Sequence, residues 1–147
     1  MRMKHLLSDL IFEAQKAFVP SRQILDNQVI AHEMMHFLNS SRSKKGYFLL
    51  KVDLSKAFDR MDWEFLRDCL NLYGFPTDYT NLIFQCILTS SLVVEINGQA
   101  SGFFKPSKGL RQGCPLSPYL FIIGTNILSF FFKLASTKDT LKGIRIA

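Results

Sequence analysis

Apolar residues in the first 40 positions recur every three or four residues, which is the spacing of amphipathic helices. The first group predicts a helix that ends before Pro20. Its members are Leu6, Leu7, Leu10, Ile11 and Ala14. A second helix is predicted from about 23 to 38, with four apolar residues facing the core. These are Ala31, Met34, Met35 and Leu38.

Positions 47–52 show a different pattern, an aromatic and branched run interrupted only at Lys51. Such a run after a polar loop predicts a buried central strand. Asp53 follows at its end, where a carboxylate is costly unless it is hydrogen-bonded or bound to a cation. Two interpretations fit: Asp53 caps the turn that begins near Ser55, or it holds a metal ion that is itself bound to a phosphate.

Phe58 favours the second interpretation, in which Asp53 holds a metal ion. If that phosphate belongs to a nucleotide, a bulky ring five residues after Asp53 would press on the sugar of this nucleotide. A ring in that place would clash with a 2′-hydroxyl, the group that distinguishes ribose from deoxyribose.

Two further helices and a hairpin are predicted next. The helices begin at Asp62 and at Thr77 or Asp78, and each has one apolar stripe. The first stripe is Trp63, Leu66, Cys69, Leu70 and Tyr73, and the second is Tyr79, Leu82, Ile83, Cys86 and Ile87. Alternating residues up to Asn97-Gly98 predict a half-buried antiparallel hairpin.

The segment 105–118 is rich in glycine, proline and cations and precedes a long apolar helix predicted from about 119 to 134. Gly109 and Gly113 would let the backbone approach a ligand closely, and the helix start favours an anionic one. An ordinary surface loop is the alternative. The charge-free run 113–132 is long enough to span a membrane, but its prolines and polar residues favour a core helix and no membrane partner.

The amino-acid composition limits which classes of protein the chain can belong to. A chain of 147 residues, 48% of them apolar, suits one folded unit. The net charge is +6, and all of this excess lies in residues 100–147, which suits nucleic acid, although a solvated basic face is the ordinary alternative. Three widely spaced cysteines and no recognisable secretory signal favour an intracellular protein, with nucleus and cytoplasm unresolved.

A competing motif lies in the second helix. His32, Glu33 and His36 spell HEMMH, in which two histidines one turn apart bind zinc beside a glutamate base. A third ligand has no recognisable place, since His5 is the remaining histidine and Glu64 lies in a different helix. Two partly exposed helix histidines are the alternative to a zinc hydrolase.

Two stretches are far more specific together than either is alone. KVDLSKAFDRMDW at 51–63 and GLRQGCPLSPYLF at 109–121 resemble the reverse transcriptases of LINE-type, non-LTR retrotransposons, of the sort found in plants. AFVPSRQILDNQVIAHE at 17–33 also resembles the fingers-side motif of that family. The resemblance covers nearly the whole chain and makes HEMMH part of a fingers helix.

The resemblance implies an α+β fold, a right-hand polymerase with fingers and a partial palm. Its helices would pack on a small antiparallel sheet that is incomplete at the C-terminus. Residues 1–147 would form a partial reverse transcriptase domain. Within it, 1–46 would be fingers-side helices and 47–147 the first part of the palm with inserted helices.

The resemblance also assigns roles to single residues. It makes Asp53 the first catalytic, metal-binding aspartate and Phe58 the residue beneath the incoming sugar. Arg111, Gln112 and Gly113 match the motif that lines the incoming nucleotide and template. Arg22, Lys105 and Lys108 would be cations close to nucleic acid. Ser21 and Cys114 depart from the family pattern, which often has Gly and Asp there.

The activity implied is template-directed transfer of nucleotides to a primer 3′-hydroxyl, an RNA-directed DNA polymerase reaction. Two ions, Mg²⁺ or Mn²⁺, would stabilise the attacking and leaving oxygens. Asp53 alone cannot hold both ions, because such sites need converging carboxylates. RNA template, DNA primer and dNTP would be the partners.

The family takes its remaining metal ligands from a Phe/Tyr-Ala-Asp-Asp sequence, and no Asp-Asp dipeptide occurs in these 147 residues. This chain alone is therefore expected to be inactive, and uncovered apolar surface, including faces of 119–134, is expected to promote self-association. A non-catalytic nucleic-acid-binding remnant is the alternative. It would use the cations Lys105, Lys108, Arg111, Lys138, Lys142 and Arg145.

Overall fold

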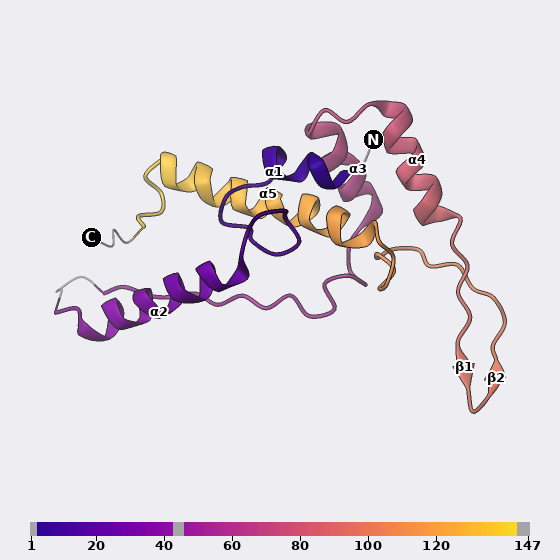
Figure 1. Cartoon of the computed structure of the whole chain (residues 1–147), viewed down its shortest axis with the longest axis horizontal. Helices are drawn as coiled ribbons and strands as arrows, with labels where there is room; N and C mark the ends of the chain where they lie inside the picture. The colour runs from indigo at the N-terminus through magenta and orange to yellow at the C-terminus, as the bar shows by residue number, and fades with distance from the viewer. Residues whose placement is uncertain (1–2, 43–45, 144–147) are drawn as a thin grey trace. The chain divides into compact units, whose positions relative to one another are not determined.

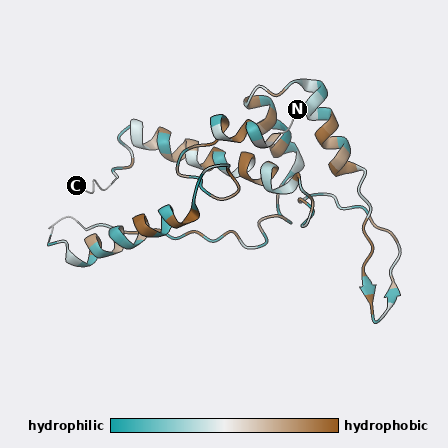
Figure 2. Ribbon diagram, viewed as in Figure 1, coloured by the Kyte–Doolittle hydropathy of each residue, from teal (hydrophilic) through white to brown (hydrophobic). Residues whose placement is uncertain are grey.

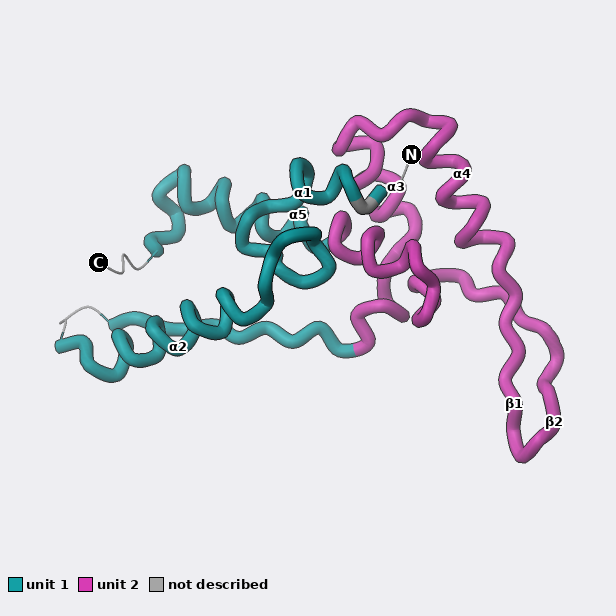
Figure 3. The backbone as a smooth tube through the Cα atoms, viewed as in Figure 1, with its two compact units in different colours: residues 1–55, 125–147 teal, residues 56–124 magenta. Residues whose placement is uncertain are grey.

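The computed structural model describes residues 3–42 and 46–143 (Figure 1). The chain divides into two compact units, shown in separate colours in Figure 3. Unit 1 is 1–55 with 125–147, and unit 2 is 56–124. These units reflect packing, so the expected boundary between fingers at 1–46 and palm at 47–147 stays a prediction.

Unit 1 begins with a 3-10 turn, Met3–His5, and a short helix, α1, Leu7–Leu10. Leu7 and Ile11 are buried, as their spacing predicts. The helix ends ten residues before Pro20, and Ile11 is already extended. It stops early because the Asn126 side chain bonds backbone groups at this end, accepting from the Phe12 N–H at 3.0 Å and donating to the Leu10 carbonyl at 3.3 Å.

Helix α2, Ile24–Ser40, confirms the second predicted helix but not its core stripe. No residue of α2 is buried. Ala31 and Met35 are exposed, while Met34 and Leu38 are only half-buried. Apolar residues along α2 are brown in Figure 2. The apolar residues of α2 therefore have the predicted helical spacing, but no core packs against them within the described part of unit 1.

The strand predicted at 47–52 is not formed. Residues 46–54 carry neither helix nor strand assignment, and side chains such as Phe48 and Leu50 are 81% and 68% exposed. A strand needs a hydrogen-bonded neighbour. The described part of unit 1 contains no strand that could supply one.

Unit 2 is built on two helices, α3, Trp63–Leu72, and α4, Thr77–Leu88. Asp62 caps α3, since its carboxylate accepts the Phe65 N–H at 2.9 Å. The predicted α3 stripe is confirmed at its centre, where Leu66, Cys69 and Leu70 are buried.

Helix α4 buries a face next to the predicted one. Thr80, Ile83 and Phe84 are buried, whereas Leu82 is 55% exposed and Cys86 is exposed. Arg67 on α3 lies 4.1 Å from the Phe84 ring centroid and donates to Asn81, which fixes this rotation of α4.

The Asn97-Gly98 hairpin is confirmed. Strands β1, Glu95–Ile96, and β2, Gln99–Ala100, pair antiparallel, and positive φ at Asn97 and Gly98 (52° and 79°) fits a type I′ turn. The hairpin extends away from α3 and α4 in Figure 1. All four strand residues are exposed, so the predicted half-buried pair is wrong in this respect.

Helix α5, Ser117–Thr137, confirms the long apolar helix. Its first half is a core helix, with Leu120, Ile122 and Ile123 buried. Its second half exposes Leu128, Phe130, Phe131 and Phe132. Length and composition would also let α5 cross a membrane, so the expected absence of a membrane partner stays a prediction. Helices with one small antiparallel sheet are compatible with the expected α+β class.

Candidate active site

Unit 2 joins parts of the two motif stretches by three hydrogen bonds. The Gly109 N–H donates to the Met61 carbonyl at 2.7 Å, and the Leu110 N–H donates to the Phe58 carbonyl at 2.8 Å. The Trp63 indole N–H donates to the Gly109 carbonyl at 2.7 Å. The glycine-rich loop is thus fixed along the turn that precedes α3, although about 50 residues separate the two in sequence.

Gly109 permits this contact. Its φ is +89°, and a Cβ at this position would lie 2.8 Å from the Asp59 carbonyl oxygen. The expected close approach of the backbone therefore occurs, and the group that Gly109 approaches is the Asp59 backbone. Gly113 also has positive φ, +81°, yet open space surrounds its position.

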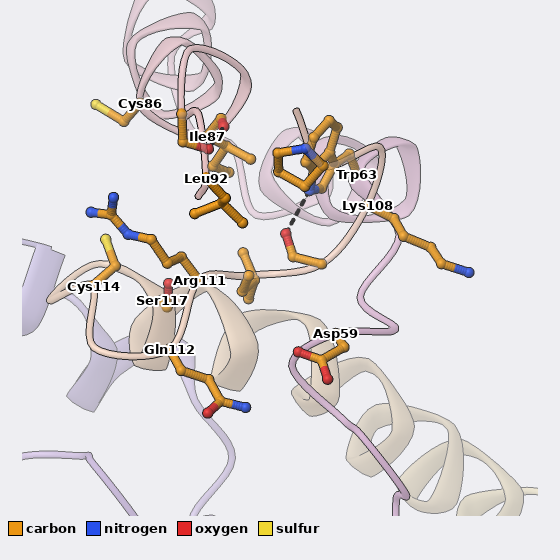
Figure 4. Close-up of a pocket in the computed structure, with 14 residues that line it drawn as sticks. Asp59, Trp63, Cys86, Ile87, Leu92, Lys108, Arg111, Gln112, Cys114 and Ser117 are labelled. Carbon is orange, nitrogen blue, oxygen red and sulfur yellow. Dashed lines mark hydrogen bonds between the residues drawn. The ribbon is translucent and has the colours of Figure 1, made fainter. Parts of the chain in front are cut away.

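A cavity of about 480 Å³ lies beside this contact (Figure 4). Arg111 and Gln112 line it from the loop, and Trp63 and Ile87 line it from α3 and α4. Lys108 and Cys114 also contribute. The site residues Arg111 and Gln112 thus share one cavity with a cation, a thiol and an indole.

The cavity wall carries charges of both signs, two cations and the Asp59 carboxylate (Figure 4). Lys108 and Arg111 are exposed cations at its edge, and Ser117 in its wall begins helix α5. The Ser117 and Tyr119 N–H groups at this helix start already donate to the Cys114 and Leu116 carbonyls, and Pro118 has no N–H, so the positive charge at the cavity comes from the two cations. Gln112 and Gly113 are exposed, so a ligand can reach both. Lys105 is exposed in the same loop but is absent from the cavity wall.

Cys114 is the one thiol with a lowered pKa among the described residues. Its partial burial raises the pKa. Hydrogen bonds from the backbone at Leu116 and Ser117, and from the side chains of Ser117 and Arg111, more than offset this effect. The sequence signalled Cys114 only as a departure from the family pattern.

Phe58 stacks on Phe121 of α5, with ring centroids 4.7 Å apart and planes at 14°. Its ring is half-buried, so one part remains accessible. This stack orients the ring, and its expected role beneath a nucleotide sugar stays a prediction.

Asp53 lies in unit 1 and is exposed, whereas Phe58, Arg111, Gln112 and Gly113 lie in unit 2. No described residue is hydrogen-bonded to its carboxylate, so the capping interpretation gains no support. In residues 3–42 and 46–143, no three acidic, histidine or cysteine side chains gather in a way that could hold a metal ion. A two-metal centre needs converging carboxylates, and the described residues do not fit one.

Arg22 has a structural role that its sequence context did not reveal. Its guanidinium donates four hydrogen bonds to backbone carbonyls in α1 and in the segment that follows it. The acceptors are Ser8, Ile11, Phe12 and Gln15, at 3.1, 3.0, 2.7 and 2.9 Å. A guanidinium has five N–H donors, so little capacity is left for nucleic acid in this conformation, and that role stays a prediction.

The HEMMH residues His32, Glu33 and His36 are exposed on α2. The described residues offer them no third ligand in position. Arg145, one of the cations expected to contact nucleic acid, lies outside the described residues.

Comparison with known proteins identifies the class. Residues 1–140 match the family model for reverse transcriptase, an RNA-dependent DNA polymerase. The chain belongs to the reverse transcriptase family.

Its relatives include proteins of retrotransposable elements. The chain is 31% identical over 82% of its length to an uncharacterized 149 kDa protein of transposon TX1 from Xenopus laevis. It is 29% identical over 73% to a retrovirus-related Pol polyprotein of the type-2 retrotransposable element R2DM from Drosophila melanogaster. It spans 9% and 10% of these two proteins. These matches confirm the resemblance to reverse transcriptases of non-LTR retrotransposons.

A third relative is shorter. An uncharacterized mitochondrial protein of Arabidopsis thaliana is 50% identical over 56 residues, which are 38% of this chain and 46% of that protein.

Proposed function

We propose that this chain is a fragment of an RNA-directed DNA polymerase of a non-LTR retrotransposon. The observation that carries the proposal is the family match over residues 1–140, which includes both motif stretches. The substrates would be an RNA template, a DNA primer and a dNTP. The setting would be intracellular.

In the complete enzyme, the cavity loop would contact the incoming nucleotide and template through Arg111, Gln112 and Gly113. Their accessibility and the cations beside them support this assignment. Phe58 would meet the sugar. Asp53 would be one carboxylate ligand of a pair of Mg²⁺ or Mn²⁺ ions. The other ligands would come from a carboxylate motif that these 147 residues do not contain.

We expect the chain alone to extend no primer. A purified 147-residue chain, given an RNA template, a DNA primer and dNTPs with Mg²⁺ or Mn²⁺, should give only background signal. Metal-dependent extension that Asp53→Ala abolishes would contradict the proposed inactivity and would leave the family assignment intact.

A chimaera tests the positive half of the proposal. Residues 1–140 replace the matching region of an active reverse transcriptase of the family, and primer extension is measured. We expect activity, and we expect Asp53→Asn to lower it by more than about a hundredfold, since even a metal's outer-shell partners are worth up to that much. Asp139→Asn, a matched change at an exposed acid on unit 1, is expected to have no effect. Equal losses for both variants would refute the role of Asp53.

A non-catalytic nucleic-acid-binding function is the second candidate. The observation that favours it is the placement of the whole net charge of +6 in residues 100–147.

A further inference from the structure

Trp63 brings an indole ring to the start of α3, beside the glycine-rich loop. Asp62 caps this helix by accepting the Phe65 N–H, so Trp63 is its first helical residue. The indole ring is half-buried, and its one polar atom, Nε1, donates to the Gly109 carbonyl at 2.7 Å, as the dashed line in Figure 4 marks. A phenylalanine or a leucine would also supply an apolar side chain here, but neither could supply this donor.

The peptide group between Gly109 and Leu110 is hydrogen-bonded at both ends. Its carbonyl accepts from Trp63, and its N–H, that of Leu110, donates to the Phe58 carbonyl at 2.8 Å. Because a peptide group is planar, bonds at its two ends hold it in one orientation. The Gly109 N–H also donates to the Met61 carbonyl, and the Leu110 side chain is buried. The loop therefore leaves this point in one defined direction.

Gly109 needs such a restraint. A residue without a Cβ adopts positive and negative φ about equally readily, so glycine admits the close approach to Asp59 but does not hold the loop there. The indole N–H holds it, because turning this peptide group over would leave the half-buried Nε1 of Trp63 without its acceptor. Arg111 and Gln112 follow shortly after Gly109 in the sequence, so their positions depend on this peptide group.

We propose that Trp63 is a positioning residue for the incoming nucleotide. It acts through Gly109 and sets where Arg111 and Gln112 meet the nucleotide and the template. The inference rests on the proposed function, in which these two side chains contact the nucleotide. The same peptide group is bonded to Phe58, so the loop and the residue proposed to meet the sugar form one hydrogen-bonded block.

Steady-state kinetics of the chimaera test this role. Trp63→Phe keeps an aromatic ring and removes the donor, and it should raise the KM for dNTP about three- to tenfold while kcat changes by less than about twofold. A purely structural residue behaves otherwise, because loss of folded enzyme lowers the apparent kcat and leaves KM unchanged. Leu70→Val, a change at a buried α3 residue outside the cavity wall, should show that structural pattern.

A histidine variant separates the donor from the size of the ring. The five-membered rings of tryptophan and histidine superpose, so Nε2 of a histidine can lie where the indole Nε1 lies. Trp63→His loses more packing than Trp63→Phe but keeps an N–H donor, and its KM should stay within about twofold of that of the unaltered chimaera. An unchanged KM in Trp63→Phe, or a KM in Trp63→His as high as in Trp63→Phe, would overturn the proposal.

Native-state proteolysis tests the contact in the 147-residue chain itself, without polymerase activity. Trypsin cuts after Lys108 and Arg111, which report opening of the loop, and after Arg67 within α3, which reports unfolding of unit 2. Trp63→Phe should speed cleavage in the loop about three- to tenfold relative to cleavage after Arg67, and Trp63→His should not. Leu70→Val should speed cleavage at all three sites together.

The two experiments separate the inference from the proposed function. If the proposed function is wrong, the unaltered chimaera extends no primer, and proteolysis of the chain still decides whether Trp63 holds the loop. Equal acceleration of cleavage after Lys108, Arg111 and Arg67 in Trp63→Phe would overturn the positioning role, whatever the chimaera does.

Discussion

At the scale of single residues, Gly109 occupies a point of the candidate site that has no room for a side chain. Its backbone lies against Asp59 and has a φ that side chains disfavour. Gly109→Ala should lower the free energy of unfolding by roughly 2–5 kcal/mol, as strain from the left-handed backbone and the clash add together. Gly74→Ala, where φ is +75° but no atom lies within 4 Å, should cost only about 1–2 kcal/mol.

The fluorescence of Trp63, the single tryptophan, reports urea unfolding of unit 2 in both variants. Equal losses for Gly109→Ala and Gly74→Ala would show that the contact with Asp59 contributes nothing.

Cys114 gives a prediction that depends on pH. Because its pKa is lowered, more of it is thiolate at a given pH than in a free thiol, so iodoacetamide should alkylate it at lower pH. Cys69 should react last, since burial and the neighbouring Asp68 raise its pKa to about 11. Ser117→Ala removes one hydrogen bond to the thiol and should move the Cys114 rate profile to higher pH. Mass spectrometry of labelled peptides measures each rate, with Ser107→Ala as the control.

Several residues show where sequence reasoning about the site ends. Gly109 was recognisable as a point of close approach, but its partner Asp59 lies 50 residues away and left no local signal. The sequence indicated a nucleic-acid contact for Arg22. It could not show the four carbonyl acceptors, because they come together only when the chain folds. Ser21, which stands where the family often has Gly, has a φ of +63°, so the departure falls where glycine is favoured.

At the scale of elements, α3 offers a matched pair of leucines. Leu70 is 0% exposed and Leu72 is 74% exposed on the same helix. Leu70→Ala should lower the free energy of unfolding by about 2–5 kcal/mol through the cavity it leaves, and Leu72→Ala by less than about 0.5 kcal/mol. Urea unfolding of the two variants measures the difference, and similar losses would mean that α3 does not pack as described.

The same helices explain which elements were predictable. Helix α3 depends on local signals, its start at Asp62 and a repeated apolar stripe. The start was correct, and the stripe was confirmed at Leu66, Cys69 and Leu70. Helix α4 rotated to bury Thr80 and Phe84, because the Arg67 contact that fixes it comes from another element. The run at 47–52 has the composition of a strand, but pairing depends on a neighbour that local sequence does not specify.

At the scale of the whole molecule, the uneven charge predicts how nucleic acid would bind. Affinity should fall steeply with salt, since cations displace counterions from phosphates. Lys108→Ala, at the edge of the cavity, should reduce the slope of log affinity against log salt by about one. Arg60→Ala, an exposed cation in the charge-balanced part of the chain, should leave it unchanged. Filter binding with single-stranded RNA measures both, and no binding at low salt would dispose of this second function.

The Asn126 side chain has a consequence for synthesis on the ribosome. It accepts the Phe12 N–H, 114 positions earlier in the sequence, and unit 1 combines residues 1–55 with residues 125–147. Unit 2 is one continuous stretch, 56–124, and is complete as soon as that stretch has left the exit tunnel. The N-terminal segment is translated first but must wait for α5, so the order of translation and the order of folding are reversed for the two units.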